Sequence, residues 1–355
     1  MKIGLLTFHY ADNYGALLQS WALSGYLRAL GHAATFIDYR PYRDSIGSLL
    51  RLPIRAWRFK WKFRVFRSAC FRTTRRYEGR MPDVKEHFGQ YWVGSDQVWN
   101  PTYFRFSDGS VNTTYFFDFL PDNAVKVSYA ASVGEGQWGE SAKKIASLIK
   151  RFHAVSLRED YAEERVKAIS DVRTCVVPDP VFLLDREHYE RLAMHVRVQK
   201  SVRRVFVYGI AAAERCLEEL AKEMKCDGSS MARAAILNFR FRLPKVDRTS
   251  YITPTPQEWL GEIMDADFII TDSFHCAAFA IIFRCPFRFV YKKFEVRTNE
   301  RVLTLLSKLG ISDTEHPDWR RVDESLSGYR STGRSYIEQA LSIGVGKEGN
   351  VDSDD

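Results

Sequence analysis

The sequence predicts an α/β protein with two lobes, each built around a parallel, doubly wound sheet. Short apolar runs that end in small or polar residues alternate with segments whose apolar residues recur at helical spacing. Such alternation is typical of a parallel sheet covered by helices. A polar, basic stretch at 186–203 interrupts the pattern, which then begins again. The chain has 355 residues, enough for two domains of ordinary size.

In the first lobe, strands and helices alternate from the first residues onward. Lys2–Phe8 is an apolar strand, Ala16–Leu30 has helical spacing and stops at Gly31, and Ala34–Asp38 is a second strand. The further expected strands are 91–93, 126–130, 153–157 and 174–177, with helices at 141–151 and 161–169. Each of these strands ends in small or polar residues, which places polar side chains at one edge of the sheet.

The second lobe repeats the pattern from Arg204. Strands are expected at 204–208, 268–270 and 287–290, and helices at 212–224, 254–264, 277–283 and 302–309. Residues 226–250 are weakly patterned. A last helix is expected at 335–343, followed by a polar, acidic tail that predicts disorder. We therefore expect a first lobe at 1–195, a second at 196–330, and a C-terminal helix and tail at 331–355.

Composition limits the partners and the compartment. The net charge of +8 suits a phosphorylated ligand, an anionic membrane face or nucleic acid, and it does not choose among them. The six cysteines form no CxxC pair, which favours reduced thiols in a reducing compartment. No apolar run reaches the length of a membrane span, and the N-terminus lacks the regions of a signal peptide. A cytoplasmic protein is expected.

Residues 51–76 form an unusual basic segment. Ten of them are Arg or Lys and none is acidic, while Trp57, Trp61 and Val65 are four residues apart and share one helix face. This pattern is typical of a helix at a membrane surface, and it is also found in a helix that packs its aromatic residues on the core. No nucleic-acid-binding module accompanies it, so nucleic acid is not expected as a partner.

Polar residues at two strand ends are the first candidates for a ligand site. Asp272-Ser273-Phe274-His275-Cys276 lies between two apolar runs, which puts His275 in the first turn of a buried helix, where free N–H groups favour anions. The alternative is a core histidine with satisfied hydrogen bonds. The loop His9–Gly15 is no dinucleotide fingerprint, but it delivers Asn13 and Gly15 to another helix N-terminus.

Several stretches together resemble the polysaccharide pyruvyl transferase family. They are Gly4–Phe8, Asn13–Gln19, Val93–Pro101, Ser128–Ser132, Ser156–Glu159, Asp179–Leu184 and Thr271–His275, in the family's order. The resemblance implies two Rossmann-like lobes that face a cleft, as in GT-B glycosyltransferases. It also implies transfer of pyruvate from phosphoenolpyruvate to two hydroxyls of a sugar. Several family members carry an arginine where this chain has Ser273.

The resemblance and the chemistry of the donor suggest roles for individual residues. His275 and Asp96 are the expected catalytic pair, because a histidine suits protonation of the donor's methylene carbon and a carboxylate suits acceptance of the hydroxyl proton. The expected donor-binding residues are Arg158, Asp272, Ser273, Lys292, Lys293 and Arg297. The expected acceptor-binding residues are Asp12, Asn13, Gly15, Ser95, Gln97 and Trp99, with Asp12 as a second candidate base and Trp99 stacking on the sugar.

No metal ligand set and no cofactor besides the co-substrate phosphoenolpyruvate are expected. The expected partner is a sugar acceptor, free or lipid-linked, with peripheral contact to the inner membrane face through residues 51–76. Two alternatives stay open at this stage. One is a GT-B glycosyltransferase with a nucleotide-sugar donor, and the other is a glycan-binding relative without catalysis.

Overall fold

The computed structural model describes residues 1–41, 54–82, 84–103, 105–106, 109–134, 136–195, 203–209, 230–235, 249–291 and 296–344. Side chains of 55, 203, 230–235, 249–251 and 296–298 are not described. The helix expected at 212–224 and the tail beyond residue 344 lie outside these ranges.

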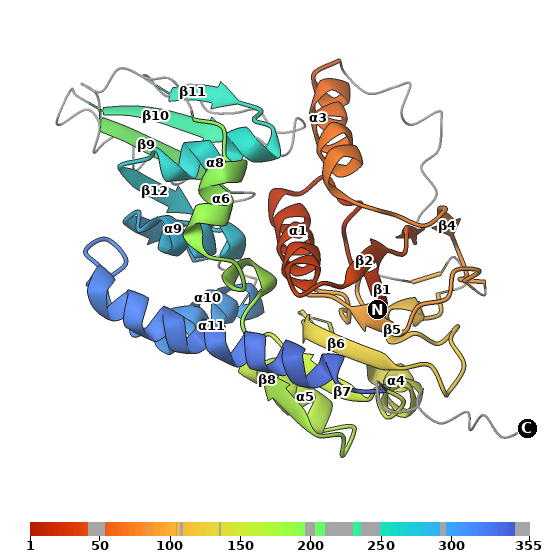
Figure 1. The fold of residues 1–355 in the computed structure, drawn as a ribbon. Helices are drawn as coiled ribbons and strands as arrows, with labels where there is room; N and C mark the ends of the chain where they lie inside the picture. Colours follow the sequence, from red (N-terminus) through yellow and green to blue (C-terminus); the bar gives the residue numbers. More distant parts are fainter. Residues whose placement is uncertain are drawn as a thin grey trace, which may run out of the picture.

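The first lobe contains a six-stranded sheet in the order β2-β1-β5-β6-β7-β8, and every neighbouring pair is parallel (Figure 1). The strands are β1 (Lys2–Leu6), β2 (Ala33–Phe36), β5 (Gln90–Val93), β6 (Lys126–Ala131), β7 (Ala154–Leu157) and β8 (Thr174–Val176). The six strands expected from the apolar runs are all present. Their parallel order brings all their carboxyl ends to one edge.

Helices follow these strands much as the sequence pattern indicates. They are α1 (Tyr14–Ala29), α4 (Ala142–Ile149) and α5 (Asp160–Lys167), with short 3-10 helices η1 (Thr114–Phe116), η2 (Gly139–Ser141) and η3 (Pro180–Phe182). The Asn13 side chain accepts a hydrogen bond from Ala16 N and caps the start of α1. Gly31, with φ of 83°, closes the same helix in the left-handed conformation that glycine favours.

The second lobe contains a five-stranded parallel sheet in the order β11-β10-β9-β12-β13. Its strands are β9 (Arg203–Tyr208), β10 (Ser230–Ala235), β11 (Thr249–Ile252), β12 (Phe268–Thr271) and β13 (Phe287–Phe289). The sequence analysis missed β10 and β11. The stretch Ser-Met-Ala-Arg-Ala-Ala has neither an apolar run nor β-branched residues, so local propensity does not mark it as a strand.

The helices described in the second lobe are α8 (Pro256–Met264), α9 (Phe274–Phe283) and α10 (Val296–Lys308). Helix α6 (Arg186–Leu192), which lies before the expected boundary at residue 195, packs against α8. Helix α8 begins as expected with a proline in its first turn. Thr255 and Glu258 form a reciprocal capping box there. All ten residues of α9 are buried, so the helix that carries His275 is fixed by packing on every side.

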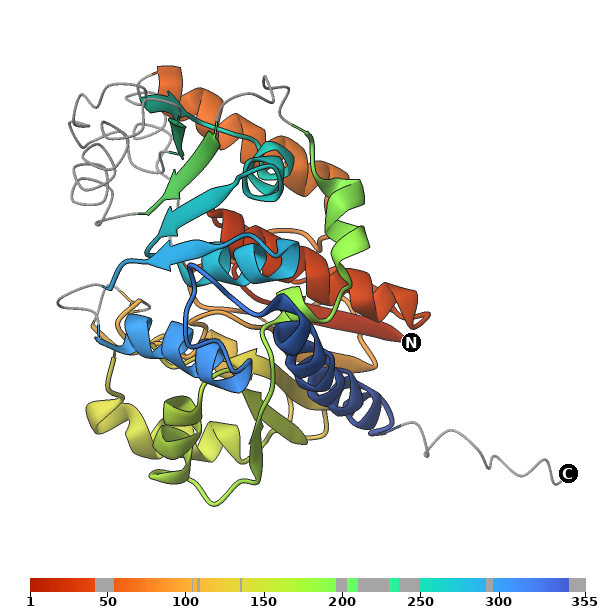
Figure 2. The ribbon, with the colours of Figure 1, turned by 90° about the vertical axis from the view of Figure 1, so that its left-hand side faces the viewer.

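The last helix, α11 (Trp319–Leu341), corrects the expectation of a short helix at 335–343. It returns to the first lobe, as two views show (Figures 1 and 2). Gln90 Nε2 donates to the Ala340 carbonyl at 2.9 Å, and Tyr336 Oη donates to the Ser128 carbonyl at 2.8 Å. The part of α11 before residue 335 contains Gly328 and Gly333 among three serines and a threonine. These residues disfavour a helix in isolation, so the sequence pattern did not indicate one there.

Gly333 is expected to be essential to this packing, whereas Gly328 is not. A Cβ atom at Gly333 would lie 2.6 Å from Tyr129 Oη, while a Cβ at Gly328 meets nothing within 4 Å. We expect Gly333→Ala to destabilise the protein by about 1–3 kcal/mol through overpacking. Gly328→Ala should stabilise it by about 0.5–1 kcal/mol. Thermal unfolding of the two variants measures this, and equal melting temperatures would contradict the docking of α11.

The two lobes share part of their apolar core. One cluster of buried residues joins α1 and β1 of the first lobe to α8 and α9 of the second. Tyr14 of α1 stacks on Trp259 of α8, with ring centroids 5.1 Å apart, and its hydroxyl donates to the Pro254 carbonyl at 2.7 Å. A second cluster fills the other face of the first sheet. The lobes therefore meet through an apolar contact beside the N-terminus of α1.

Helix α3 (Ile54–Cys70) and the small parallel pair β3 (Tyr39–Arg40) and β4 (Tyr77–Glu78) complete the first lobe. The aromatic residues of α3 divide into two faces, since Phe59, Phe63 and Phe66 are buried whereas Trp57 and Trp61 are about half exposed, at 52% and 48%. The alternatives of core packing and an exposed aromatic face are thus both realised, on opposite sides of one helix. None of the helices in the described ranges has the length and apolar character needed to cross a membrane.

Candidate active site

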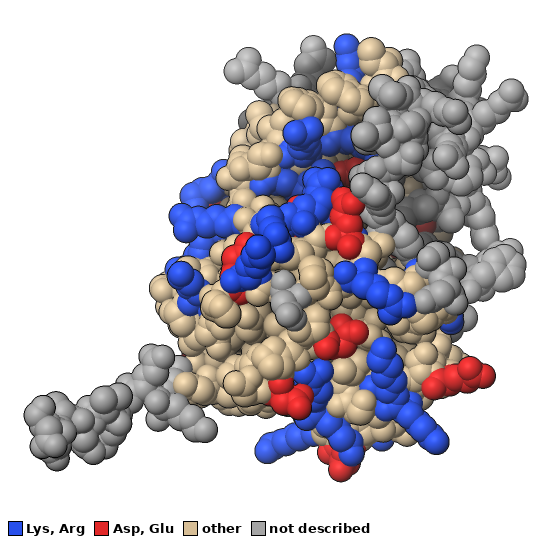
Figure 3. All heavy atoms as spheres, turned by 90° about the vertical axis from the view of Figure 1, so that its right-hand side faces the viewer, with Lys and Arg blue, Asp and Glu red and all other residues tan. Residues whose placement is uncertain are grey.

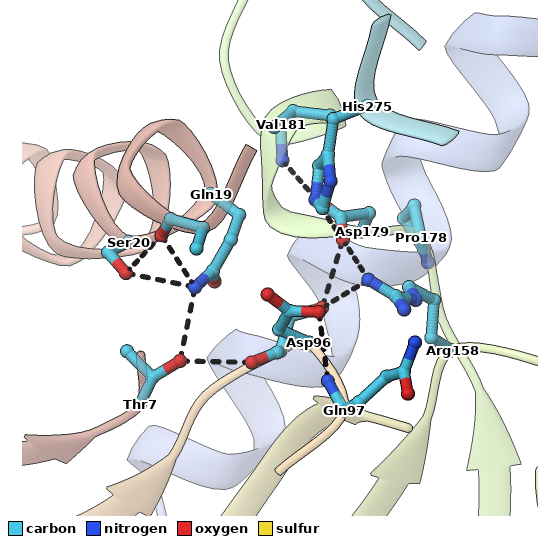
Figure 4. Close-up of polar contacts among 12 residues, drawn as sticks. Thr7, Gln19, Ser20, Asp96, Gln97, Arg158, Pro178, Asp179, Val181 and His275 are labelled. Carbon is cyan, nitrogen blue, oxygen red and sulfur yellow. Dashed lines mark hydrogen bonds and ion pairs between the residues drawn. The ribbon is translucent and has the colours of Figure 1, made fainter. Parts of the chain in front are cut away.

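Polar side chains from the carboxyl ends of several strands converge at the junction of the lobes (Figure 4). Ser95 follows β5, Arg158 follows β7 and Asp179 follows β8, all in the first lobe. His275 follows β12 in the second lobe. Strand ends at one edge of a parallel sheet are the usual ligand site in open α/β folds. The cluster of Ser95, Arg158, Asp179 and His275 is called the junction cluster below.

Asp179 is the centre of the junction cluster. Its Oδ1 accepts from Val181 N and caps η3, while its Oδ2 accepts from Ser95 Oγ and from Arg158 Nη1, both at 2.9 Å. The side chain is fully buried. Burial alone would raise the pKa of Asp179, but His275 and Arg158 reverse this and hold that pKa well below its ordinary value. The carboxylate is therefore ionised and fixed in position.

Arg158 lies between two carboxylates. Its Nε donates to Glu159 Oε1 at 2.7 Å, and the guanidinium carbon lies 4.9 Å from the centroid of the Phe274 ring of the second lobe. Burial would lower the pKa of Arg158, but the two carboxylates raise it above its ordinary value. Among the described residues its Nη2 atom has no hydrogen-bond partner. A buried cationic donor without a partner is costly, and an anionic ligand would satisfy it.

His275 reaches from the second lobe toward this carboxylate. It lies in the first turn of α9, two residues after the N-cap residue Ser273, whose Oγ accepts from Cys276 N. Its Nε2 lies 3.5 Å from Asp179 Oδ2, at the outer limit of a hydrogen bond. The ring is buried between the lobes, with 10% of the side chain exposed.

Gly15 makes room for the His275 ring. It lies in the first turn of α1, and a Cβ atom at this position would lie 2.2 Å from His275 Nδ1. Real Cβ atoms do not approach a neighbour so closely, so only glycine allows α9 and α1 to meet in this way. The sequence analysis assigned Gly15 to the acceptor loop, and the structure places it against His275.

We expect Gly15→Ala to have two opposing effects, a gain in the intrinsic stability of helix α1 and a displacement of the His275 side chain. Alanine favours a helix by about 1 kcal/mol over glycine, yet its Cβ would displace His275. Turnover should fall more than about tenfold, because a shift of one ångström at a catalytic group has effects of this size or larger. Thermal melts and turnover of Gly15→Ala and of the double variant with His275→Ala measure the clash.

Gly25→Ala in the same helix is the matched control, since its Cβ would make an ordinary 3.8 Å contact with Leu184. The double variant should melt at a higher temperature than Gly15→Ala alone. Equal effects of alanine at the two glycines would contradict the close contact with His275.

Asp96 and Gln97 lie beside the junction cluster at the end of β5. Asp96 is partly exposed and has a φ of 79°, with its Oδ1 accepting from Gln97 N at 2.9 Å. The hydrogen-bonding groups around Gln97 favour the amide orientation in which its oxygen accepts from Arg301 Nη1 and Nη2 of α10, each at 3.2 Å. The strained turn at Asp96 and this contact across the lobes fit a position at a ligand site.

Trp99 requires a correction. Its ring is 1% exposed and stacks on Phe116, with centroids 5.1 Å apart, and its Nε1 donates to the Tyr115 carbonyl. It belongs to the core of the first lobe, so the expected stacking on a sugar is wrong for this arrangement. Asn100 is also buried and supports the same turn, because its Oδ1 accepts from Thr102 N at 3.0 Å and from Thr102 Oγ1 at 2.7 Å. Tryptophan and asparagine brace the loop here.

The remaining predicted site residues have other contacts or lie outside the described residues. Asp12 pairs with Arg67 of α3 at 2.8 Å, and Asn13 is occupied as the cap of α1. Asp272 is buried next to Gly209, where a Cβ would lie 2.8 Å from its Oδ1. Lys292 and Lys293 lie outside the described residues, and of Arg297 only the backbone in α10 is described. The predicted roles of Lys292, Lys293 and Arg297 in donor binding stay predictions.

The sequence analysis missed Asp179 and Arg301 as site residues. Asp179 stands between two prolines directly after a strand, and its position at a strand end was the available signal. Arg301 lies on a helix of the other lobe, so its contact with Gln97 is not visible in local sequence. Within the described ranges, no group of three or more His, Cys, Asp and Glu side chains is placed to hold a metal ion.

Comparison with known proteins identifies the family of this chain. Residues 13–291 match the profile of the family described as polysaccharide pyruvyl transferase. The chain belongs to the polysaccharide pyruvyl transferase family. The match includes the junction cluster and most of both lobes. A search of curated proteins finds no match to the chain.

Solved structures support the two-lobed fold of this pyruvyl transferase family member. It is similar to a UDP-GlcNAc 2-epimerase from Neisseria meningitidis, with a TM-score of 0.51, 10% identity, and coverage of 96% of this chain and 94% of the other. A 2-epimerase described as putative, from Listeria monocytogenes, has a TM-score of 0.51, 9% identity and coverage of 94% and 97%. Another UDP-N-acetylglucosamine 2-epimerase has a TM-score of 0.54, 9% identity and coverage of 96% and 95%. At this identity the likeness shows the fold alone, and the expected GT-B-like fold is confirmed.

Proposed function

We propose that this protein transfers the pyruvate of phosphoenolpyruvate to two hydroxyls of a sugar and forms a cyclic ketal. The observation that carries the proposal is the junction cluster, in which His275 lies against the buried carboxylate of Asp179 beside the unpartnered Nη2 of Arg158. A proton donor next to a buried cation suits a substrate that carries both a phosphate and a carboxylate. Family membership supports the same reaction class.

In the proposed reaction His275 gives a proton to the methylene carbon of the donor, and the carbon bearing the phosphate gains oxocarbenium character. The first sugar hydroxyl attacks that carbon and loses its proton to Asp96. The bond between this carbon and the bridging oxygen then breaks, and phosphate leaves. The second hydroxyl adds in its place. One of the two hydroxyl protons restores to His275 the proton that it gave to the methyl group. The other hydroxyl proton leaves with phosphate.

The residues divide between the two lobes in this proposal. Arg158 of the first lobe binds an anionic group of the donor, and Arg301 of α10, close to Gln97, brings a cation from the second lobe. Ser273, where several family members have arginine, caps α9 instead. The helix N-terminus and Arg301 together would supply the positive charge that is missing at this position.

The test is to incubate the protein with phosphoenolpyruvate in D₂O, together with glycosides whose hydroxyl pairs can close a five- or six-membered ring. Phosphate release with a singly deuterated methyl group in the product is the expected result, because one solvent-derived proton enters the methylene carbon. Nucleotide sugars in place of phosphoenolpyruvate test the glycosyltransferase alternative. Release of UDP with no phosphate from phosphoenolpyruvate would overturn the proposal.

A further inference from the structure

Helix α3 carries an exposed apolar stripe that the proposed reaction does not use. The stripe consists of Ile54, Trp57, Trp61 and Val65, which are 70%, 52%, 48% and 51% exposed. Their spacing of three and four residues places them on one face of the helix. The two indoles stack with ring centroids 5.6 Å apart and planes inclined by 11°. The buried face, with Phe63, is on the opposite side.

Basic side chains border this stripe on both edges. Arg58 and Arg64 are exposed, Lys60 is partly exposed, and the guanidinium of Arg64 lies 5.6 Å from the Trp61 ring centroid. In the described part of the chain, Lys62 and Arg67 are the α3 cations with carboxylate partners, namely Glu258 and Asp12. In the view of Figure 3, from the right-hand side of Figure 1, Lys and Arg gather over the upper left part of the described surface, with a few Asp and Glu among them. The cations at the edges of the stripe are therefore available to an anionic surface.

We propose that α3 docks on an anionic lipid bilayer, with the indoles of Trp57 and Trp61 at the level of the headgroups. Tryptophan has an apolar ring and a polar N–H, which suits it to this boundary. A basic border attracts acidic headgroups. Segment 51–76 contains no acidic residue, so charge complementarity favours an anionic partner. A narrow apolar stripe with cations on both edges fits a bilayer surface better than a protein groove.

Docking through α3 would set the position of the junction cluster relative to the lipid. Arg67 donates to the Ala11 carbonyl at 3.3 Å and to Asp12, in the loop that leads into α1. Lys62 donates to the Thr253 carbonyl at 2.5 Å, just before α8 of the second lobe. The helix is thus bonded to both lobes within a few residues of Gly15 and Trp259. A docked α3 would hold this junction near the membrane surface.

The experiment is co-sedimentation of the full chain with vesicles of phosphatidylcholine, with and without roughly a third phosphatidylglycerol. We expect binding to the anionic vesicles at low salt and its loss as salt rises, since exposed charges are screened within about 10 Å at 0.1 M. Arg58→Glu/Arg64→Glu and Trp57→Ala/Trp61→Ala should each weaken binding at least about tenfold. Lys143→Glu/Lys144→Glu, exposed on α4, is the control and should bind as strongly as the unchanged protein.

Brominated lipids provide a second readout. Their quenching of tryptophan fluorescence should be strong in the unchanged protein and largely absent from Trp57→Phe/Trp61→Phe, which preserves an aromatic surface. Both readouts use binding alone, so they remain valid whether or not the protein transfers pyruvate. Equal binding to neutral and anionic vesicles, or no binding to anionic vesicles at low salt, would overturn the proposal.

Discussion

His275→Ala is expected to lower turnover by about a hundredfold or more, the usual effect of removing a general acid. The ring lies against Asp179 in a buried position, and it is the histidine that contacts this carboxylate among the described ion pairs. Folding should be preserved, because the ring packs at the edge of the lobe contact and not within the apolar core. Steady-state turnover of phosphoenolpyruvate and a thermal melt measure the two effects separately.

His316→Ala is the matched control for this prediction. The His316 side chain is 84% exposed and contacts Asp313 on the surface, so its removal should leave turnover and the melting temperature nearly unchanged. Turnover of His275→Ala close to that of His316→Ala would remove histidine from the proposed mechanism.

Asp179→Asn is expected to reduce both stability and turnover. The carboxylate accepts from Ser95 and Arg158 and lies near His275. Among the described ion pairs, Arg158 contacts two carboxylates, those of Glu159 and Asp179. The substitution therefore leaves its buried guanidinium with Glu159 alone. Breaking a buried pair on one side costs about 3 kcal/mol of unfolding free energy. Denaturant unfolding and turnover at neutral pH measure the two losses.

The stability difference should also depend on pH in a defined direction. Burial raises the pKa of Asp179, but the charges and hydrogen bonds of His275 and Arg158 lower it by more. The pKa of Asp179 in the folded protein is therefore below its value in the unfolded chain. The ionised carboxylate therefore contributes stability above about pH 4, and that contribution disappears as pH falls through the lower, folded pKa. Asp185→Asn, whose carboxylate is 46% exposed and pairs with Arg330, should cost less than about 1 kcal/mol. A cost of Asp179→Asn no larger than that of Asp185→Asn would contradict the central position of Asp179.

Most of the fold could be predicted because its strands are short apolar runs with polar ends. β5, β7 and β12 lie within a residue or so of their expected bounds. β10 could not be predicted, since Ser230–Ala235 is a strand only through its pairing with β9 and β11. The start of α11 was missed because Gly333 disfavours a helix locally, whereas the close approach to Tyr129 requires it.

The candidate site was predicted in outline by the rule that strand ends meet at one edge. The rule correctly brought Ser95 and Arg158 together at the edge of the first sheet. His275 follows a strand of the second sheet, and its place beside them follows from the two facing lobes that the family resemblance implied. The rule could not predict the direction of Trp99, because the left-handed turn at Asp96 rotates the following residues into the core. It also gave no reason to choose Asp179 over the other acidic residues at strand ends, since its importance depends on contacts with side chains from three other segments.

The return of α11 to the first lobe has a consequence for the order in which the protein folds on the ribosome. Domains usually fold from the N-terminus as they are synthesised. Here Gln90 bonds to Ala340 and Ser128 bonds to Tyr336. Both residues of α11 are synthesised after the whole second lobe. The first lobe therefore cannot complete its structure until α11 has been translated. We expect the two lobes to gain stability together, and calorimetry should accordingly show one cooperative unfolding transition instead of two.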